Sequence, residues 1–159
     1  MLRHSKVESD RREALRLLDL YLFANEDNAD AWYAKASCHD FLGEEIEAEP
    51  CYLKVYDLGW MQLPASEQKS FFVGFGSTLR NNLKFSESAT LLEEALRHFP
   101  DDPSLKIFLA FTRYSLGQDT LAARLSFEAL RDGIERGFDG YERAIAWYID
   151  HLDTHPQRR

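Results

Sequence analysis

The sequence predicts an all-α protein made of repeated pairs of antiparallel helices. Apolar residues recur at intervals of three and four along most of the 159 residues, which is the period of a helix face. No run alternates apolar and polar residues as a half-buried strand would. Residues 69–102 read as two helices joined by a short turn and closed by a proline, and similar units lie on both sides of this stretch.

The first helix of this central unit is predicted to end near Asn81 and Asn82, because asparagine tolerates the left-handed conformation that stops a helix. Pro100 ends the second helix, since the residue before a proline disfavours helical geometry. Each helix has one apolar face, formed by Phe72, Phe75, Gly76 and Leu79 in the first helix and by Phe85, Ser88, Leu92, Ala95 and Leu96 in the second.

This spacing resembles the tetratricopeptide repeat, which extends over 34 residues with aromatic, small and proline positions in the same order. The match departs at Leu83, where the family usually has glycine, and at Ser88, where it usually has alanine. The runs STLRNNLKF and YERAIAWYIDHL resemble those of small bacterial members of the family. The resemblance implies a right-handed α-solenoid of about eight helices that binds other proteins and has no assigned reaction.

The rest of the chain fits a single domain, 1–159, built around this repeat. Residues 7–24 are predicted as an N-terminal capping helix, since terminal repeats are usually atypical. The first repeat covers residues 29–62 and places Trp32, Ala36 and Gly43 at family positions. Six extra residues lie in the linker around residues 59–64, and this apolar linker is expected to fold back on the helices.

The second repeat is 69–102 and the third is 103–136, where Gly117 and Ala122 match in register. Lys106 stands in the third repeat where the family usually has tryptophan. A final capping helix is predicted over residues 138–154, with an apolar face that includes Tyr141, Ile145 and Tyr148.

Charge and composition exclude several classes of partner. The net charge of −8 and pI near 5.1 argue against nucleic acid or an anionic membrane surface. No apolar run approaches the roughly 18 residues that a membrane span needs, and the N-terminus lacks the apolar core of a secretory signal. The two cysteines fit a reducing, cytoplasmic compartment.

No constellation of residues predicts catalysis, a cofactor or a metal. Gly74 to Thr78 lies inside a helical pattern without the preceding strand that a phosphate loop requires. Cys38, His39 and Cys51 lack the spacing of a zinc site, and buried thiols are the simpler interpretation. His151 and His155 have a chelating spacing, but Pro156 follows at once, so surface histidines are favoured.

The resemblance implies that the first helices of the repeats line a concave groove, where ligands bind. The groove residues that it assigns in this chain are Tyr33, Ser37, Asp40, Ser77, Arg80, Asn81, Phe111 and Tyr114. For Phe111 and Tyr114 an equal alternative is that they pack under the final helix. The residues of the family's clamp for C-terminal carboxylates are absent.

Trp147 lies beside the apolar face of the final helix and is predicted to be partly exposed. It is expected to form a contact, either at a dimer interface at the C-terminal end or at a flank of the ligand groove. The alternative is that the tail or the loop RDGIERGFDG folds over it. The leading hypothesis is a non-catalytic interaction module that binds a peptide or helix of a partner protein. The alternative is a homodimeric structural protein that associates through exposed aromatic residues. An enzyme is the least supported class.

Overall fold

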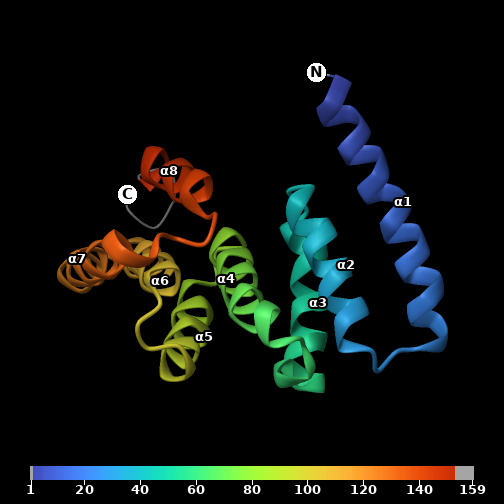
Figure 1. The fold of residues 1–159 in the computed structure, drawn as a ribbon, viewed down its shortest axis with the longest axis horizontal. Helices are drawn as coiled ribbons and strands as arrows, with labels where there is room; N and C mark the ends of the chain where they lie inside the picture. The colour runs from blue at the N-terminus through green and yellow to red at the C-terminus, as the bar shows by residue number, and fades with distance from the viewer. Residues whose placement is uncertain (1, 153–159) are drawn as a thin grey trace. The chain divides into compact units, whose positions relative to one another are not determined.

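A computed structural model describes residues 2–152, with side chains for residues 7–134 and 136–152 (Figure 1). This part of the chain holds eight α-helices, one short 3-10 helix and no strand, so the all-α prediction is confirmed. The elements are α1 (Leu2–Ala24), α2 (Ala29–Phe41), α3 (Glu45–Leu58), η1 (Trp60–Gln62), α4 (Ala65–Asn81), α5 (Phe85–His98), α6 (Pro103–Ser115), α7 (Asp119–Arg136) and α8 (Glu142–Asp150).

The two end helices differ in length from the prediction. The first begins at Leu2, five residues before the predicted start. The last covers nine residues, from Glu142 to Asp150, because the glycines at 137 and 140 take positive φ angles and delay its start. Residues 153 and 154 of the predicted helix, and His155 of the histidine pair, lie outside the described residues.

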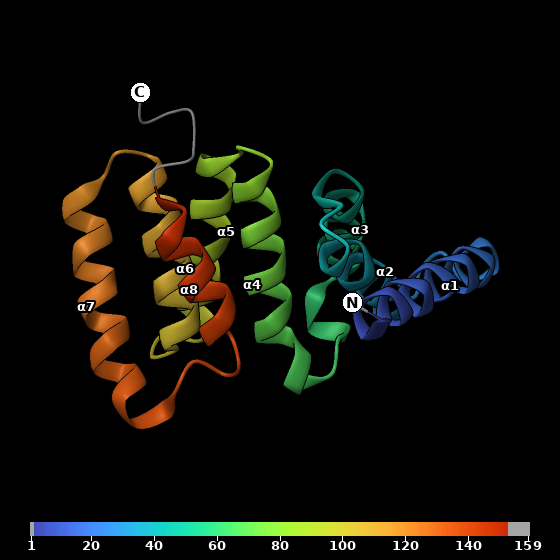
Figure 2. The ribbon, with the colours of Figure 1, turned by 90° about the horizontal axis from the view of Figure 1, so that it is seen from above.

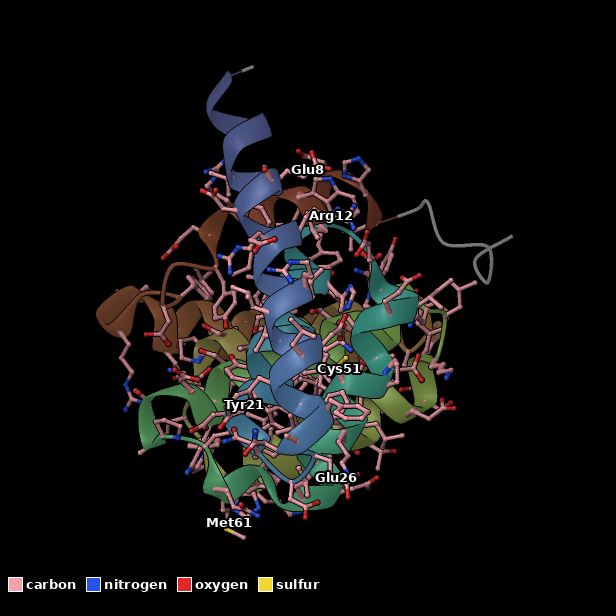
Figure 3. The ribbon with its side chains drawn as sticks, turned by 90° about the vertical axis from the view of Figure 1, so that its right-hand side faces the viewer. Glu8, Arg12, Tyr21, Glu26, Cys51 and Met61 are labelled. Carbon is pink, nitrogen blue, oxygen red and sulfur yellow. The ribbon has the colours of Figure 1, made fainter. Side chains whose placement is uncertain are left out.

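The chain divides into two compact units, Met1–Thr78 (unit 1) and Leu79–Arg159 (unit 2), with the boundary inside α4. In unit 1, α1 packs on α2 and α2 packs on α3. Figure 3 shows α1 in front of this pair, with Arg12 on its upper half. Arg12 forms an ion pair with Glu44 in the turn after α2, and this contact ties α1 to the first repeat.

An aromatic cluster forms the core of unit 1. The Tyr52 ring on α3 stacks on Phe75 of α4 with centroids 5.6 Å apart, and it lies 6.0 Å from Phe71. Tyr33 of α2 contacts both Tyr52 and Phe71 at centroid distances of 6.3 and 6.2 Å. These rings come from three helices, so their burial fixes α2, α3 and the first part of α4 against one another.

The linker after α3 folds back on the helices, as the sequence predicts. Trp60 in η1 is buried and packs edge-on against Phe72 with centroids 4.9 Å apart. Leu63 is also buried, whereas Met61 points away from the fold in Figure 3 and is 69% exposed. The extra apolar residues of the linker therefore extend the core of unit 1.

Local sequence signals begin and end the helices. Asn28 and Asp102 cap α2 and α6 by accepting hydrogen bonds from the backbone N–H groups of Ala31 and Leu105, at 2.8 and 2.9 Å. The turns between paired helices need a left-handed residue. Gly43 and Gly117 supply it at φ 71° and 72°, and Leu83 takes the same conformation at φ 62°.

In unit 2, α5 packs on α6 and α6 packs on α7. Ser88 and Thr112 are fully buried and share a hydrogen bond of 3.1 Å between their hydroxyls, which joins α5 to α6. Lys106 stands where the family usually has tryptophan. Its Nζ forms an ion pair with Oδ2 of Asp132 on α7 at 2.5 Å, which joins α6 to α7. Figures 1 and 2 both show the last helix, α8, lying over α6.

Candidate functional site

A hollow of about 530 Å³ opens on unit 1 between α2 and the start of α4. Its α2 wall comes from positions 30, 33, 34 and 37, which share one helix face because they are spaced by three and four residues. We call this hollow the unit 1 groove, and it is lined by Asp30, Tyr33, Ala34, Ser37, Pro64, Glu67 and Ser70.

The unit 1 groove carries negative charge without a compensating cation. Asp30 and Glu67 are exposed, no lysine or arginine lines the hollow, and neither carboxylate pairs with any side chain among the described residues. Tyr33 is held in place by its ring contacts with Tyr52 and Phe71. The groove therefore combines a positioned aromatic ring with two carboxylates that are open to solvent.

The structure brings together only part of the predicted groove set in this hollow. Tyr33 and Ser37 line it, whereas Asp40 lies deeper, where Oδ2 accepts a hydrogen bond from Tyr52 at 3.1 Å. Burial is the main cause that raises the pKa of Asp40 to about 6. Ser77 donates a 3.0 Å hydrogen bond to the Gly74 carbonyl within α4, so its hydroxyl is already used.

Pro64 and Glu67 are groove residues that the sequence analysis missed. Both precede Lys69, where the repeat count starts, while α4 itself begins at Ala65. The signal was present, because a proline directly before a helical pattern often marks a helix start. If the helix is taken to start directly after Pro64 and not at Lys69, Glu67 and Ser70 are three residues apart on the same helix face.

The other predicted groove residues belong to unit 2, where two of them are buried. Arg80 is 1% exposed and Phe111 is 4% exposed. Phe111 packs against Tyr148 of α8 with ring centroids 5.3 Å apart. This arrangement corresponds to the alternative given for Phe111, in which it packs under the final helix. Tyr114 is half-buried, and Asn81 accepts a 3.1 Å hydrogen bond from the Tyr148 hydroxyl.

Arg80 has an unusual environment for an arginine. None of its three guanidinium nitrogens makes a hydrogen bond within the described part of the chain. The guanidinium carbon instead lies 4.8 Å from the Tyr148 ring centroid and 6.0 Å from that of Phe111. Burial lowers the pKa of Arg80, and Tyr148 opposes this shift through its charge interaction and as a hydrogen-bond partner whose geometry is short of a normal hydrogen bond. We call Arg80, Asn81, Phe111 and Tyr148 the Arg80 cluster.

Trp147 is 53% exposed, as the helical geometry predicts. Its indole stacks on the His151 ring with centroids 4.3 Å apart and meets the Tyr148 ring edge-on at 5.1 Å. Tyr148 belongs to α8 and His151 is the residue that ends it, so both contacts are local. The contact predicted for Trp147 with a partner or a second copy stays a prediction.

Cys38 and Cys51 are free and buried. Among the described residues, no group of three or more His, Cys, Asp or Glu side chains is placed to hold a metal ion. In the same part of the chain, no helix combines the length and apolar content needed to cross a membrane.

Comparison with known families decides the relationship that the repeat spacing suggested. A family model described as a tetratrico peptide repeat matches residues 29–152, which is most of the chain. The chain belongs to the tetratricopeptide repeat family. Members of this family generally mediate protein–protein interactions and are typically non-catalytic. No curated protein matches the chain.

Proposed function

We propose that this tetratricopeptide repeat protein is a non-catalytic module that binds a segment of a partner protein in the unit 1 groove. The observation that carries the proposal is the open hollow lined by Tyr33 and Ser37, two of the residues that the family resemblance assigns to the ligand face. The family relationship supports a protein as the ligand. The occupant is a peptide or a helix of that protein.

The chemistry of the unit 1 groove favours a segment that carries a lysine or arginine. Asp30 and Glu67 attract such a cation. Because both carboxylates are exposed in the free protein, they stay hydrated until the ligand binds. The ring of Tyr33 offers a face for the apolar stem of the same side chain. Because packing with Tyr52 and Phe71 already holds this ring, binding requires little ordering of the protein.

We also propose that the protein acts in the cytoplasm of a bacterium. Two cysteines that are both buried and unpaired suit a reducing compartment. The net charge of −8 favours a protein partner over nucleic acid or an anionic lipid surface.

Filling the groove tests this function. Ala34 is exposed and lines the hollow, so Ala34→Trp fills the space without disturbing the core. The matched control is Ala123→Trp, at an exposed alanine of α7 in unit 2. We expect the control to capture the same partner from bacterial lysate as wild type, and Ala34→Trp to lose it. Equal capture by both variants would contradict the proposal.

Self-association is a second candidate, and one specific surface favours it. Phe127, Leu130 and Ile134 on α7 are 72%, 58% and 78% exposed and share one face at spacings of three and four. An uncovered stripe of this kind is typical of a helix that packs against another copy. Sedimentation of wild type and Leu130→Glu over a range of concentrations tests it, since a dimer through this stripe dissociates in the variant.

A further inference from the structure

The last helix, α8, packs on α6 in unit 2. Ile145 and Tyr148 are its buried residues, and Tyr148 packs on Phe108 and Phe111 of α6 at 5.7 and 5.3 Å. Both Figure 1 and Figure 2 show α8 over α6. Meanwhile Phe127, Leu130 and Ile134, on the helix that an end cap would cover, remain exposed.

Few features of α8 and its linker hold this helix in place by themselves. The helix has nine residues, fewer than the roughly 12 to 15 that give an isolated helix marginal stability in water. The linker before it contains Gly137, Asp139 and Gly140, all with positive φ, at 72°, 54° and 83°. Contacts with the repeat therefore hold α8 in place, and Tyr148 contributes ring contacts with Phe108 and Phe111 and a hydrogen bond to Asn81.

The surface beneath α8 carries a positive charge that the fold leaves without an anion. Arg80 is buried, and none of its guanidinium nitrogens makes a hydrogen bond of normal geometry; in the described part of the chain, the Tyr148 hydroxyl is the one polar group that acts on it. Arg80 forms no ion pair with any acidic side chain among the described residues. Ring contacts with Tyr148 and Phe111 offset only part of the loss of solvation. A buried guanidinium whose hydrogen-bond donors are unused calls for an explanation, and a carboxylate from a binding partner would satisfy them.

We propose that the Arg80 cluster is a docking site for an amphipathic helix of a partner protein, which replaces α8 and places a carboxylate against the Arg80 guanidinium. The guanidinium fork matches a carboxylate with two parallel hydrogen bonds, which the Tyr148 ring cannot provide. The inference rests on the proposed interaction function but concerns a different surface from the unit 1 groove. It predicts that the partner helix carries an acidic residue at the position that Tyr148 occupies in α8.

Two synthetic peptides test the charge requirement on the full-length protein. Both have the sequence of residues 141–152, one with Tyr148→Glu and the other with Tyr148→Gln. The protein carries Tyr148→Ala, which removes the ring contacts with Phe108 and Phe111 and should weaken the attachment of α8. Fluorescence anisotropy should show that the Glu peptide binds about tenfold more tightly than the Gln peptide, the preference typical of a charge-assisted hydrogen bond. Wild type should bind both peptides more weakly, because α8 competes.

A second variant assigns the preference to Arg80. In the double variant Arg80→Met, Tyr148→Ala, the two peptides should bind with equal affinity. The proposal would be overturned if the Tyr148→Ala protein bound the two peptides with equal affinity, or if it bound neither peptide. It would also be overturned if the preference for the Glu peptide remained in the double variant. This readout is independent of partner capture by Ala34→Trp, so failure of the unit 1 groove and failure of the Arg80 cluster give different results.

Thermal stability separates a ligand-binding arginine from a structural one. Replacing a buried, unpaired cation by an apolar side chain of similar length should leave the melting temperature of Arg80→Met equal to or above that of wild type. A fall of more than roughly 10 °C would show that the fold depends on Arg80, and it would overturn the proposal.

Discussion

The hydroxyl of Tyr52 on α3 donates a hydrogen bond to Oδ2 of Asp40 on α2 across 3.1 Å. Tyr52 is 2% exposed, and burial is the main cause that raises its pKa well above the ordinary value. Burial likewise raises the pKa of Asp40 to about 6, with a further increase from Glu45 and an opposing effect of the Tyr52 hydrogen bond. The bond therefore joins two helices through a carboxyl group that titrates near neutral pH.

Asp40 should make the stability of the protein depend on pH in an unusual direction. Its pKa is raised from 3.8 to about 6 in the folded state, so the folded protein binds more protons than the unfolded chain between these values. The free energy of unfolding should consequently fall as pH rises through this window, by on the order of 2–3 kcal/mol from this group.

Urea unfolding of wild type and Asp40→Asn at pH 4, 5, 6 and 7 measures this contribution. We expect the two proteins to be similar at pH 4, and the variant to gain progressively over wild type up to pH 7, since the amide still accepts from Tyr52 and never ionises. A difference between the proteins that is constant with pH would contradict the assignment.

Gly74 should be intolerant of a side chain because of Tyr52. A Cβ at this position would touch the Tyr52 hydroxyl and lie 3.0 Å from its Cζ, and the buried ring has no room to move. We expect Gly74→Ala to lower the free energy of unfolding by about 1–2 kcal/mol, despite the better helix propensity of alanine. Thermal unfolding of Gly74→Ala in a Tyr52→Phe background is the control, where loss of the hydroxyl should relieve part of the effect.

Leu83 should be a position at which glycine stabilises the protein. It adopts φ 62° in the turn between α4 and α5, although a β-carbon disfavours this conformation by roughly 1–2 kcal/mol. Leu83 is 46% exposed, so only about half of its surface contributes burial that glycine would lose. We expect Leu83→Gly to raise the free energy of unfolding by about 1 kcal/mol in urea titrations.

Gly117 provides the matched control for Leu83. It occupies the equivalent turn of the next repeat at φ 72°, with open space where a Cβ would stand. Gly117→Ala should therefore lower stability by about 1 kcal/mol through backbone strain alone. The same sign of change in both variants would show that the left-handed turn does not control stability here.

The repeat fold was predictable because its signals are local. Helical spacing, the proline at 100 and the capping residues Asn28 and Asp102 each act within one or two turns of chain, so the sequence displays them directly. Leu83 shows where tertiary packing overrides a local preference. The helix pair forms around it even though the residue disfavours the required turn.

The docking of α8 could not be predicted in the same way. The apolar face with Ile145 and Tyr148 shows that this helix packs on something, but periodicity does not say whether the surface belongs to α6 or to α7. That choice decides whether Arg80 and Phe111 are open or covered. The sequence therefore indicated the groove positions, while their accessibility depended on a contact between residues 67 positions apart, Asn81 and Tyr148.

Trp147 should contribute to an intermolecular contact and not to stability. Its indole is 53% exposed, and in the described part of the chain its ring contacts are with Tyr148 and His151, both from α8 or its end. We expect Trp147→Glu to reduce self-association or partner capture, measured by sedimentation and pull-down, while the melting temperature stays close to that of wild type. A lower melting temperature with unchanged mass and unchanged capture would contradict this assignment.

Photo-crosslinking from the unit 1 groove tests most directly the claim that this face binds another protein. A benzophenone amino acid at position 34 places the reactive group in the hollow, and the same group at position 123 on α7 is the control. After irradiation in bacterial cells and mass spectrometry, the account predicts one recurrent partner segment, with a lysine or arginine near the crosslinked residue, at position 34 and not at position 123. The same set of proteins at both positions would contradict it.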